Sequence, residues 1–180
     1  KKLKFICIEQ GINFENGAID LGVRAEMPDI IMKDINENFY EAKMIYYTSI
    51  YRDKMRTFCS NPSGFIAVEK HSDDVILANG HAYKDKKSTN TNLALLCTKT
   101  FTHPFNQPFE YATSIAKMTS MLTDGKILVQ SYGDLKAGRR STEESLARLN
   151  IVPTTDDYVA GDIALACPKR ILDNIMEFIE

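Results

Sequence analysis

The 180-residue sequence has no hydrophobic run long enough to cross a membrane. Its longest uninterrupted hydrophobic stretches, 93–97 and 163–167, have five residues each, whereas a membrane helix needs about 20. The formal net charge is only −2, so no overall field attracts nucleic acid or an anionic lipid surface. We therefore expect a soluble protein with no membrane partner, and the charge does not favour nucleic acid as a partner.

The cysteines and histidines lack the paired spacing of a metal site. No CxxC or HxxxH occurs among Cys7, Cys59, Cys97, Cys167, His71, His81 and His103, so no metal is expected. Isolated thiols, no Asn-x-Ser/Thr sequon and no N-terminal targeting pattern favour a reducing compartment, the cytoplasm. Because the sequence starts at Lys1 without a methionine, we expect a segment of a longer protein.

The glycine-rich motifs that bind nucleotide phosphates are also missing. No two of the nine glycines stand one residue apart, which excludes the GxGxxG of a Rossmann domain. The stretch 133–141 has the glycine spacing of a P-loop, but Arg139 and Arg140 stand where that motif needs Lys followed by Ser or Thr. These arginines either pair with an acidic neighbour such as Asp134, the commoner case, or bind an anionic group of a ligand.

The composition is that of an ordinary globular domain, with 44% hydrophobic and 26% charged residues, and the length suits a single domain over 1–180. Strict alternation of hydrophobic and polar residues from Ile19 to Met27 predicts a strand. Tight turns separate five further short strands, so we expect an antiparallel meander with its last strand central; the five are 44–50, 55–59, 65–69, 75–79 and 93–98. A turn at 61–64 and a polar loop at 83–92 interrupt it.

Helical patterns dominate the second half of the sequence. A short helix is expected at 29–39, and Pro108 begins a helix whose hydrophobic stripe ends at 124–125. A capping-box pattern at 141–144 predicts a helix to about Asn150, and Pro168 opens the last helix. The segment 127–132 suits a strand or a helix. The predicted class is α+β: a mixed, mainly antiparallel sheet in the first half, covered by helices from the second half.

Three side chains or groups could carry chemistry. His81 follows Gly80 at a strand end and precedes a polar loop, which suits acid or base catalysis, although a lone histidine is more often structural. Cys59 is close in sequence to Arg56, which could lower its pKa, but an inert cysteine is the commoner case. The basic patch 84–87 is most often a solvated loop.

Six ordered motifs together resemble the uncharacterised FAD-dependent dehydrogenases, formerly called NAD-utilizing dehydrogenases. The resemblance runs from Asp20 to the last helix and departs from the family pattern at Ala82 and Glu143. The motifs are Asp20-x-Gly22-Val23-Arg24; Arg56-Thr57-Phe58-Cys59-x-Asn61-Pro62-x-Gly64; Asn79-Gly80-His81-x-Tyr83; Asn90-Thr91-Asn92; Gly133-Asp134-Leu135-x-x-Gly138-Arg139-Arg140-Ser141-Thr142; and Gly161-Asp162.

The resemblance implies a flavoprotein in which a Rossmann FAD-binding domain is interrupted by a second domain. This chain resembles that inserted domain, which covers the flavin and forms the substrate pocket. FAD would then be bound mainly by the Rossmann domain, the partner in the full-length protein, with NAD(P) possible and a small molecule as substrate. No cofactor is expected to bind this chain alone, which should be inactive alone.

The candidate residues facing substrate or flavin are Arg56, Asn61, His81, Lys86, Asn92, Arg139 and Arg140. No catalytic residue is assigned. One alternative is a non-catalytic module that binds an anionic ligand, an RNA or a protein through 84–87 and 139–140 together. Another is a self-contained enzyme with His81 as base, which requires an enclosed pocket and a nearby acidic partner.

Overall fold

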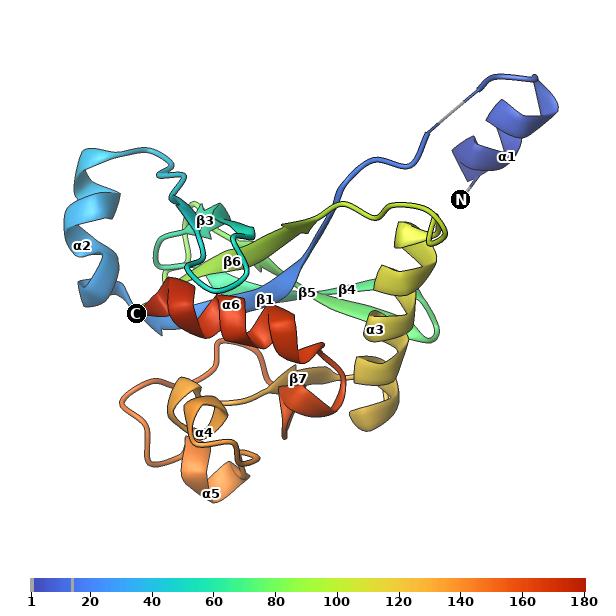
Figure 1. The fold of residues 1–180 in the computed structure, drawn as a ribbon. Helices are drawn as coiled ribbons and strands as arrows, with labels where there is room; N and C mark the ends of the chain where they lie inside the picture. The colour runs from blue at the N-terminus through green and yellow to red at the C-terminus, as the bar shows by residue number, and fades with distance from the viewer. Residues whose placement is uncertain (1, 14) are drawn as a thin grey trace.

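The computed structural model describes residues 2–13 and 15–180 and has the predicted α+β class (Figure 1). The helices are α1 (Lys2–Glu9), α2 (Asp29–Asn38), α3 (Pro108–Leu122), α4 (Tyr132–Lys136), α5 (Glu143–Leu146), α6 (Lys169–Ile179) and the 3-10 turn η1 (Ile163–Leu165). The strands are β1 (Ile19–Pro28), β2 (Ile45–Tyr47), β3 (Lys54–Asn61), β4 (Phe65–Ser72), β5 (Val75–His81), β6 (Asn90–Lys99), β7 (Ile127–Val129) and β8 (Tyr158–Ala160).

The main sheet has four antiparallel strands in the order β1-β6-β3-β2. β6 is central, as predicted, and pairs with β1 from Asn90 opposite Pro28 to Lys99 opposite Ile19. The predicted continuous meander is wrong, because β4 and β5 form a separate two-stranded hairpin and β6 enters between β1 and β3. Turn chemistry reports only which strands follow one another, whereas the hydrophobic side chains of β6 are buried by neighbours distant in sequence.

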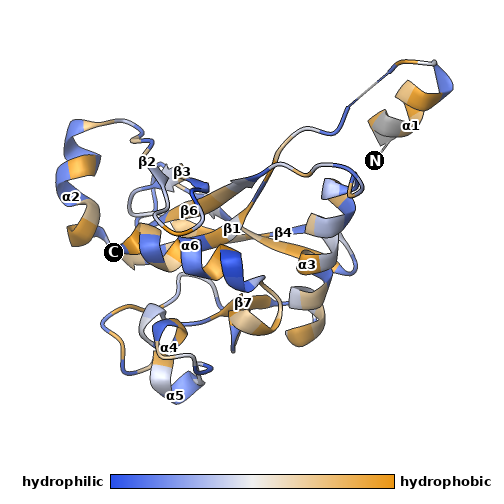
Figure 2. Ribbon diagram, in the orientation of Figure 1, coloured by the Kyte–Doolittle hydropathy of each residue, from blue (hydrophilic) through white to orange (hydrophobic). Residues whose placement is uncertain are grey.

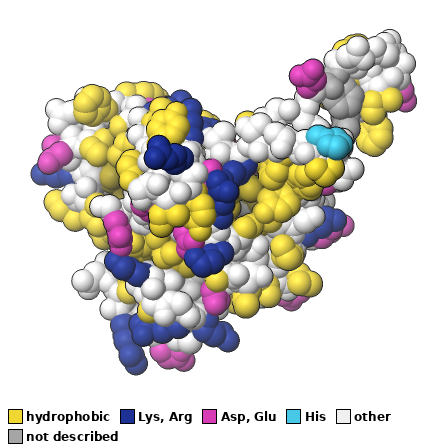
Figure 3. Space-filling model, viewed as in Figure 1, with side chains coloured by type: hydrophobic (Ala, Val, Ile, Leu, Met, Phe, Trp, Pro, Cys, Tyr) yellow, Lys and Arg dark blue, Asp and Glu magenta, His cyan; other side chains and the backbone are white. Residues whose placement is uncertain are grey.

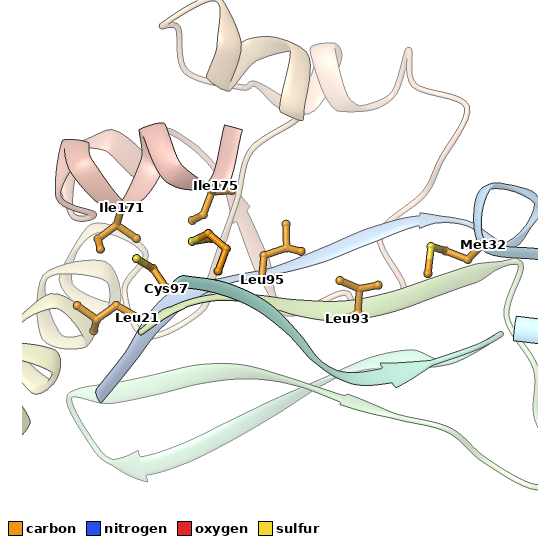
Figure 4. Close-up of a cluster of buried hydrophobic side chains, with 8 residues drawn as sticks. Leu21, Met32, Leu93, Leu95, Cys97, Ile171 and Ile175 are labelled. Atoms are coloured by element: carbon orange, nitrogen blue, oxygen red, sulfur yellow. The ribbon is translucent and has the colours of Figure 1, made fainter. Parts of the chain in front are cut away.

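One face of this sheet carries the hydrophobic core, covered by α6. Ile171 and Ile175 of α6 point at Leu95 and Cys97 of β6, and Met32 of α2 lies at the far end (Figure 4). Figure 2 shows both hydrophobic and hydrophilic residues along α6, whose buried positions include Leu172, as the predicted stripe requires. Removing such a side chain from water contributes about 1.5 to 3 kcal/mol.

The opposite face of the sheet receives the β4–β5 hairpin, drawn below the sheet in Figure 4. Successive side chains of a strand point to opposite faces, so Arg24 and Asn92 lie on this side while Leu93 faces the core. α3 closes the hairpin's end, where the backbone N–H of Ile76 donates to Ser120 Oγ at 3.1 Å.

The predicted helices at 29–39, from Pro108 and from Pro168 are confirmed. The helix after the capping box is shorter than expected and ends at Leu146. Its N-cap is Thr142, whose hydroxyl accepts from Ser145 N–H, rather than Ser141. Ser141 Oγ instead donates to Asp134 at 2.7 Å, so that hydroxyl serves another element.

Two shorter segments also differ from expectation. The strand predicted at 44–50 is confined to β2, because a turn closed by Thr48 N–H and Asp53 O at 3.0 Å begins directly after it. The open segment 127–132 divides into strand β7 and the start of α4, and β7 pairs with β8 in parallel. Within the residues that the structure describes, no helix is long and apolar enough to cross a membrane.

Candidate functional site

Residues from four of the six motifs meet in one hydrogen-bonded group, which we call the inner polar cluster: Arg24 of β1, Asn61 of β3, Asn79 of β5 and Asn92 of β6. Arg24 Nη1 donates to Asn92 Oδ1 at 2.7 Å and Arg24 Nη2 to Asn79 Oδ1 at 3.2 Å. Asn61 Nδ2 donates to the same Asn92 oxygen at 3.3 Å. The cluster thereby joins the hairpin to the main sheet.

An irregularity in β3 brings Asn61 into the cluster. The pairing of β3 with β6 shifts register between Phe58 and Asn61, and Cys59 adopts a positive φ of 48°. The carbonyl of Cys59 then accepts from Asn61 Nδ2 at 2.7 Å and from Arg24 Nη1 at 3.2 Å. A bulge of this kind redirects a side chain that regular pairing would place elsewhere.

Gly80 is the point of closest approach between the hairpin and the cluster. A Cβ atom at this position would lie 2.2 Å from Asn92 Oδ1, 2.3 Å from Asn61 Nδ2 and 2.4 Å from Arg24 Nη1. No side chain fits there without displacing these groups. The Asn79-Gly80 motif therefore has a packing cause.

The charge of Arg24 is not balanced by an ion pair with any carboxylate of the described residues. Burial lowers the pKa of its guanidinium, while nearby Cys59 and Glu69 act in the opposite direction. Arg24 Nε and Asn92 Nδ2 are buried donors without a hydrogen-bond partner. Their chemistry suits an acceptor, but both atoms are closed off from solvent, so the cluster as it stands braces the hairpin.

A second group lies at the surface beside the cluster, and we call it the outer loop group: Phe65, His81, Tyr83 and Lys86. The rings of His81 and Tyr83 have centroids 4.4 Å apart, Tyr83 meets Phe65 at 5.6 Å, and Lys86 Nζ lies 4.5 Å above the Phe65 ring. His81, Tyr83 and Lys86 are exposed. This group offers stacking surface and one cation.

The turn 61–64 and the loop that ends at Thr89 are joined by hydrogen bonds. Ser88 N–H donates to Ser63 O at 2.9 Å, and Ser88 Oγ donates to Gly64 O at 2.5 Å. Ser63 in turn donates to Asp29 at the start of α2. The loop is therefore shorter than predicted, since β6 already begins at Asn90, and its C-terminal end is fixed.

Arg56 lies apart from the other candidates of the first half. It forms an ion pair with Asp20 at 2.6 Å across the sheet, and its guanidinium carbon is 4.9 Å from the centroid of the Phe58 ring. Burial raises the pKa of Asp20, but hydrogen bonds from Arg56 and Thr98 outweigh it and the pKa is lowered. Arg56 thus has a structural partner in place.

The arginines of the 133–141 stretch confirm the commoner interpretation for Arg139. Arg139 Nε donates to Asp134 Oδ1 at 2.8 Å, and this bond, with those from Ser141 and Ser145, holds the pKa of the Asp134 carboxyl well below its usual range. Arg140 is exposed beside it. The basic residues 84–87 stand on the β5–β6 connection and 139–140 on the α4–α5 connection.

His81 was a candidate base for a self-contained enzyme, which requires an acidic partner and a pocket beside the imidazole. Among the described residues its imidazole makes no hydrogen bond to a carboxylate, and neither of the two surface hollows described below is lined by it. Within residues 2–13 and 15–180, no group of three or more His, Cys, Asp or Glu side chains could hold a metal ion.

Sequence reasoning nominated Asn61 and Asn92 but missed Arg24, Asn79 and Gly80 as members of the same cluster. Arg24 carried a signal, because it occupies the polar face of the clearest predicted strand. A comparison with protein-family models and one with curated proteins find no match to this chain.

Proposed function

We propose that this chain is the substrate-pocket and flavin-covering domain of an FAD-dependent oxidoreductase. The observation that carries the proposal is the inner polar cluster, where Arg24, Asn61, Asn79 and Asn92 come together from four motifs of the resemblance. Motifs that are scattered in sequence and meet in space are what a shared domain architecture requires. The resemblance and the geometry therefore support each other.

The surface that would face the flavin is the outer loop group. Aromatic rings and a cation beside them suit contact with a planar ring system that carries negative charge. His81 ends β5 directly after Gly80, which packs against the inner polar cluster, and Lys86 lies on the following loop, whose C-terminal end is fixed by Ser88. Hydride transfer would be the chemistry of the flavin, and this chain would contribute orientation and electrostatics.

The chain lacks the glycine-rich GxGxxG cradle that holds the pyrophosphate of FAD in a Rossmann domain. Its P-loop-like stretch is occupied by the Asp134–Arg139 pair. We infer that a Rossmann domain in the intact protein holds the pyrophosphate, that NAD(P) is the candidate electron donor and that a small molecule is the substrate. Four cysteines that stay free support a cytoplasmic location.

The test compares the intact open reading frame with the 180-residue chain. After reconstitution with FAD and removal of free flavin, the intact protein should retain flavin absorbance and the 180-residue chain should not. Within the intact protein, Lys86→Gln should shift the flavin absorbance band, whereas Lys126→Gln, a matched exposed lysine far from the outer loop group in sequence, should leave it unchanged.

Two results would contradict the proposal. An intact protein that stays colourless after reconstitution would exclude a flavoprotein. Tight FAD binding by the 180-residue chain that excess adenosine diphosphate does not displace would show that the FAD phosphate cradle lies inside it.

A further inference from the structure

A hollow of about 530 Å³ lies at the other end of the main sheet, between the β2–β3 turn, the end of β6 and the start of α6. We call it the Asp53 hollow, after the one carboxylate in its lining. None of the seven candidate residues lines it. Its volume falls in the range of about 300 to 1,000 Å³ that small-molecule sites occupy.

The lining of the hollow is strongly cationic although the chain as a whole is slightly acidic. Four cations face one carboxylate: Arg52, Lys54, Lys99 and Arg170 against Asp53. The net charge of the whole chain is −2, so this is a local concentration of positive charge. In Figure 3, Lys and Arg side chains gather beside a hydrophobic surface on the face toward the viewer.

Two of these cations are already paired with Asp53 and two are not. Arg170 donates to Asp53 through Nε and Nη2, both at 2.8 Å, and Lys99 also pairs with Asp53. Arg52 and Lys54 form no ion pair with any described residue. Lys54 lies near enough to Asp20 to help lower the pKa of that carboxyl, but the ion pair of Asp20 is with Arg56. An anion entering the hollow would therefore meet two unpaired cations.

The floor of the hollow is fixed by buried contacts. Asn174, which is 0% exposed, donates to Asp53 Oδ2 at 2.8 Å and to Cys97 Sγ at 3.4 Å. Burial opposes the charged form of Asp53, but the bonds from Arg170, Lys99 and Asn174 outweigh it and hold the pKa of this carboxyl well below its usual range. The cations on Asp53 are thus held in place before any ligand arrives.

Aromatic side chains form the walls. Phe101 and Tyr111 pack edge to face with centroids 5.4 Å apart on one side, and Tyr47, 63% exposed, lines the other. A second hollow of about 520 Å³, lined by Tyr47, Thr48, Ser49 and Arg52, adjoins the first through two shared residues. Arg52 has a positive φ of 53° in the turn between them.

We propose that the Asp53 hollow binds a nucleoside phosphate, with the phosphates on Arg52 and Lys54 and the base against the aromatic walls. Guanidinium and ammonium groups bind phosphate oxygens through charge-assisted hydrogen bonds. An aromatic side chain can stack on any base, because every base has a π-face. The inference does not depend on the flavoprotein proposal, since it uses none of the residues that carry it.

The test is calorimetric titration of the 180-residue chain with adenosine diphosphate, adenosine and inorganic phosphate. We expect adenosine diphosphate to bind about tenfold more tightly than either of the others, because each lacks one half of the recognition. The double variant Arg52→Gln/Lys54→Gln should weaken adenosine diphosphate about tenfold. The control is Lys126→Gln/Arg148→Gln, which removes one exposed lysine and one exposed arginine elsewhere and should leave binding unchanged.

Three results would overturn the proposal. They are no binding of adenosine diphosphate at millimolar concentration, equal affinity for adenosine diphosphate and inorganic phosphate, and an equal loss of affinity in the two double variants. Circular dichroism spectra that match the wild type show that a loss of affinity is not a loss of fold. These outcomes do not depend on whether the intact protein binds flavin, so failure of the flavoprotein proposal would not affect the test.

Discussion

The inner polar cluster and the Asp53 hollow lie on the same sheet and handle positive charge in opposite ways. In the cluster, Arg24 is enclosed by neutral amides and carbonyls, and its remaining donor has no route to solvent. In the hollow, a carboxylate fixes two cations while two others stay open. The residues most visible in the sequence motifs thus brace the fold, while the open cationic hollow is formed by residues outside those motifs.

The largest effect is expected from Gly80→Ala, which places a methyl group inside the inner polar cluster. We expect a loss of about 2 to 3 kcal/mol in the free energy of unfolding, because three mutually bonded side chains must move. Urea unfolding followed by circular dichroism measures it, since the chain has no tryptophan. Gly133→Ala is the control: a Cβ there meets nothing within 4 Å. Equal stability of the two variants would mean that the cluster is not a brace.

A smaller effect is expected on the side of the hollow from Asp53→Asn. Losing the charge that Arg170 and Lys99 share should cost about 2 kcal/mol at neutral pH. Because the folded-state pKa of Asp53 is lowered, its contribution is complete above the ordinary carboxyl pKa of about 4 and is lost as the pH falls below it. As the pH falls from about 4 to about 2, the free energy of unfolding should therefore decrease less in the variant than in the wild type.

The matched control is Asp85→Asn, an exposed carboxylate in the loop before β6. It should keep the acid-induced loss of the wild type. If Asp53→Asn and Asp85→Asn unfold alike across this pH range, the Asp53 pairs do not stabilise the fold.

The smallest effect is expected from a variant that gives Arg24 a carboxylate partner, as Asp53 is for Arg170 and Lys99. Asn92→Asp would place a carboxylate at the oxygen that Arg24 Nη1 contacts at 2.7 Å and would remove the unpartnered Nδ2 donor. The free energy of unfolding should stay within about 1 kcal/mol of wild type or rise, whereas Asn92→Ala should lower it by about 2 kcal/mol. If the aspartate destabilises as much as alanine does, Arg24 needs no counter-charge.

Local sequence patterns predicted where the helices and strands lie better than they predicted which of them pack side by side. The alternation of β1, the proline and Asp124-Gly125 boundaries of α3, and the central place of β6 all follow from periodicity and turn chemistry. The capping box moved by one residue because Ser141 bonds Asp134 in space, which no local rule records. The order of the strands likewise depends on pairing across most of the chain.

The two sites were visible in sequence to different degrees. Asn61 and Asn92 stood in conspicuous polar turns and were nominated, while Gly80 became meaningful only once three side chains were found around it. Nothing in the sequence announced the hollow, because Asp53 and Arg170 are 117 residues apart and each looks like a solvated charge. A carboxylate and a cation reveal a site only when the fold brings them together.

Because β6 lies between β1 and β3, the main sheet cannot be completed until β6 has been synthesised. As the chain leaves the ribosome, β1 and the β2–β3 hairpin appear first, and both present unpaired backbone edges until Asn90 to Lys99 has emerged. Such edges pair readily with other chains. Synthesis therefore passes through an interval in which the nascent sheet lacks its middle strand and exposes the strand edges that β6 later covers.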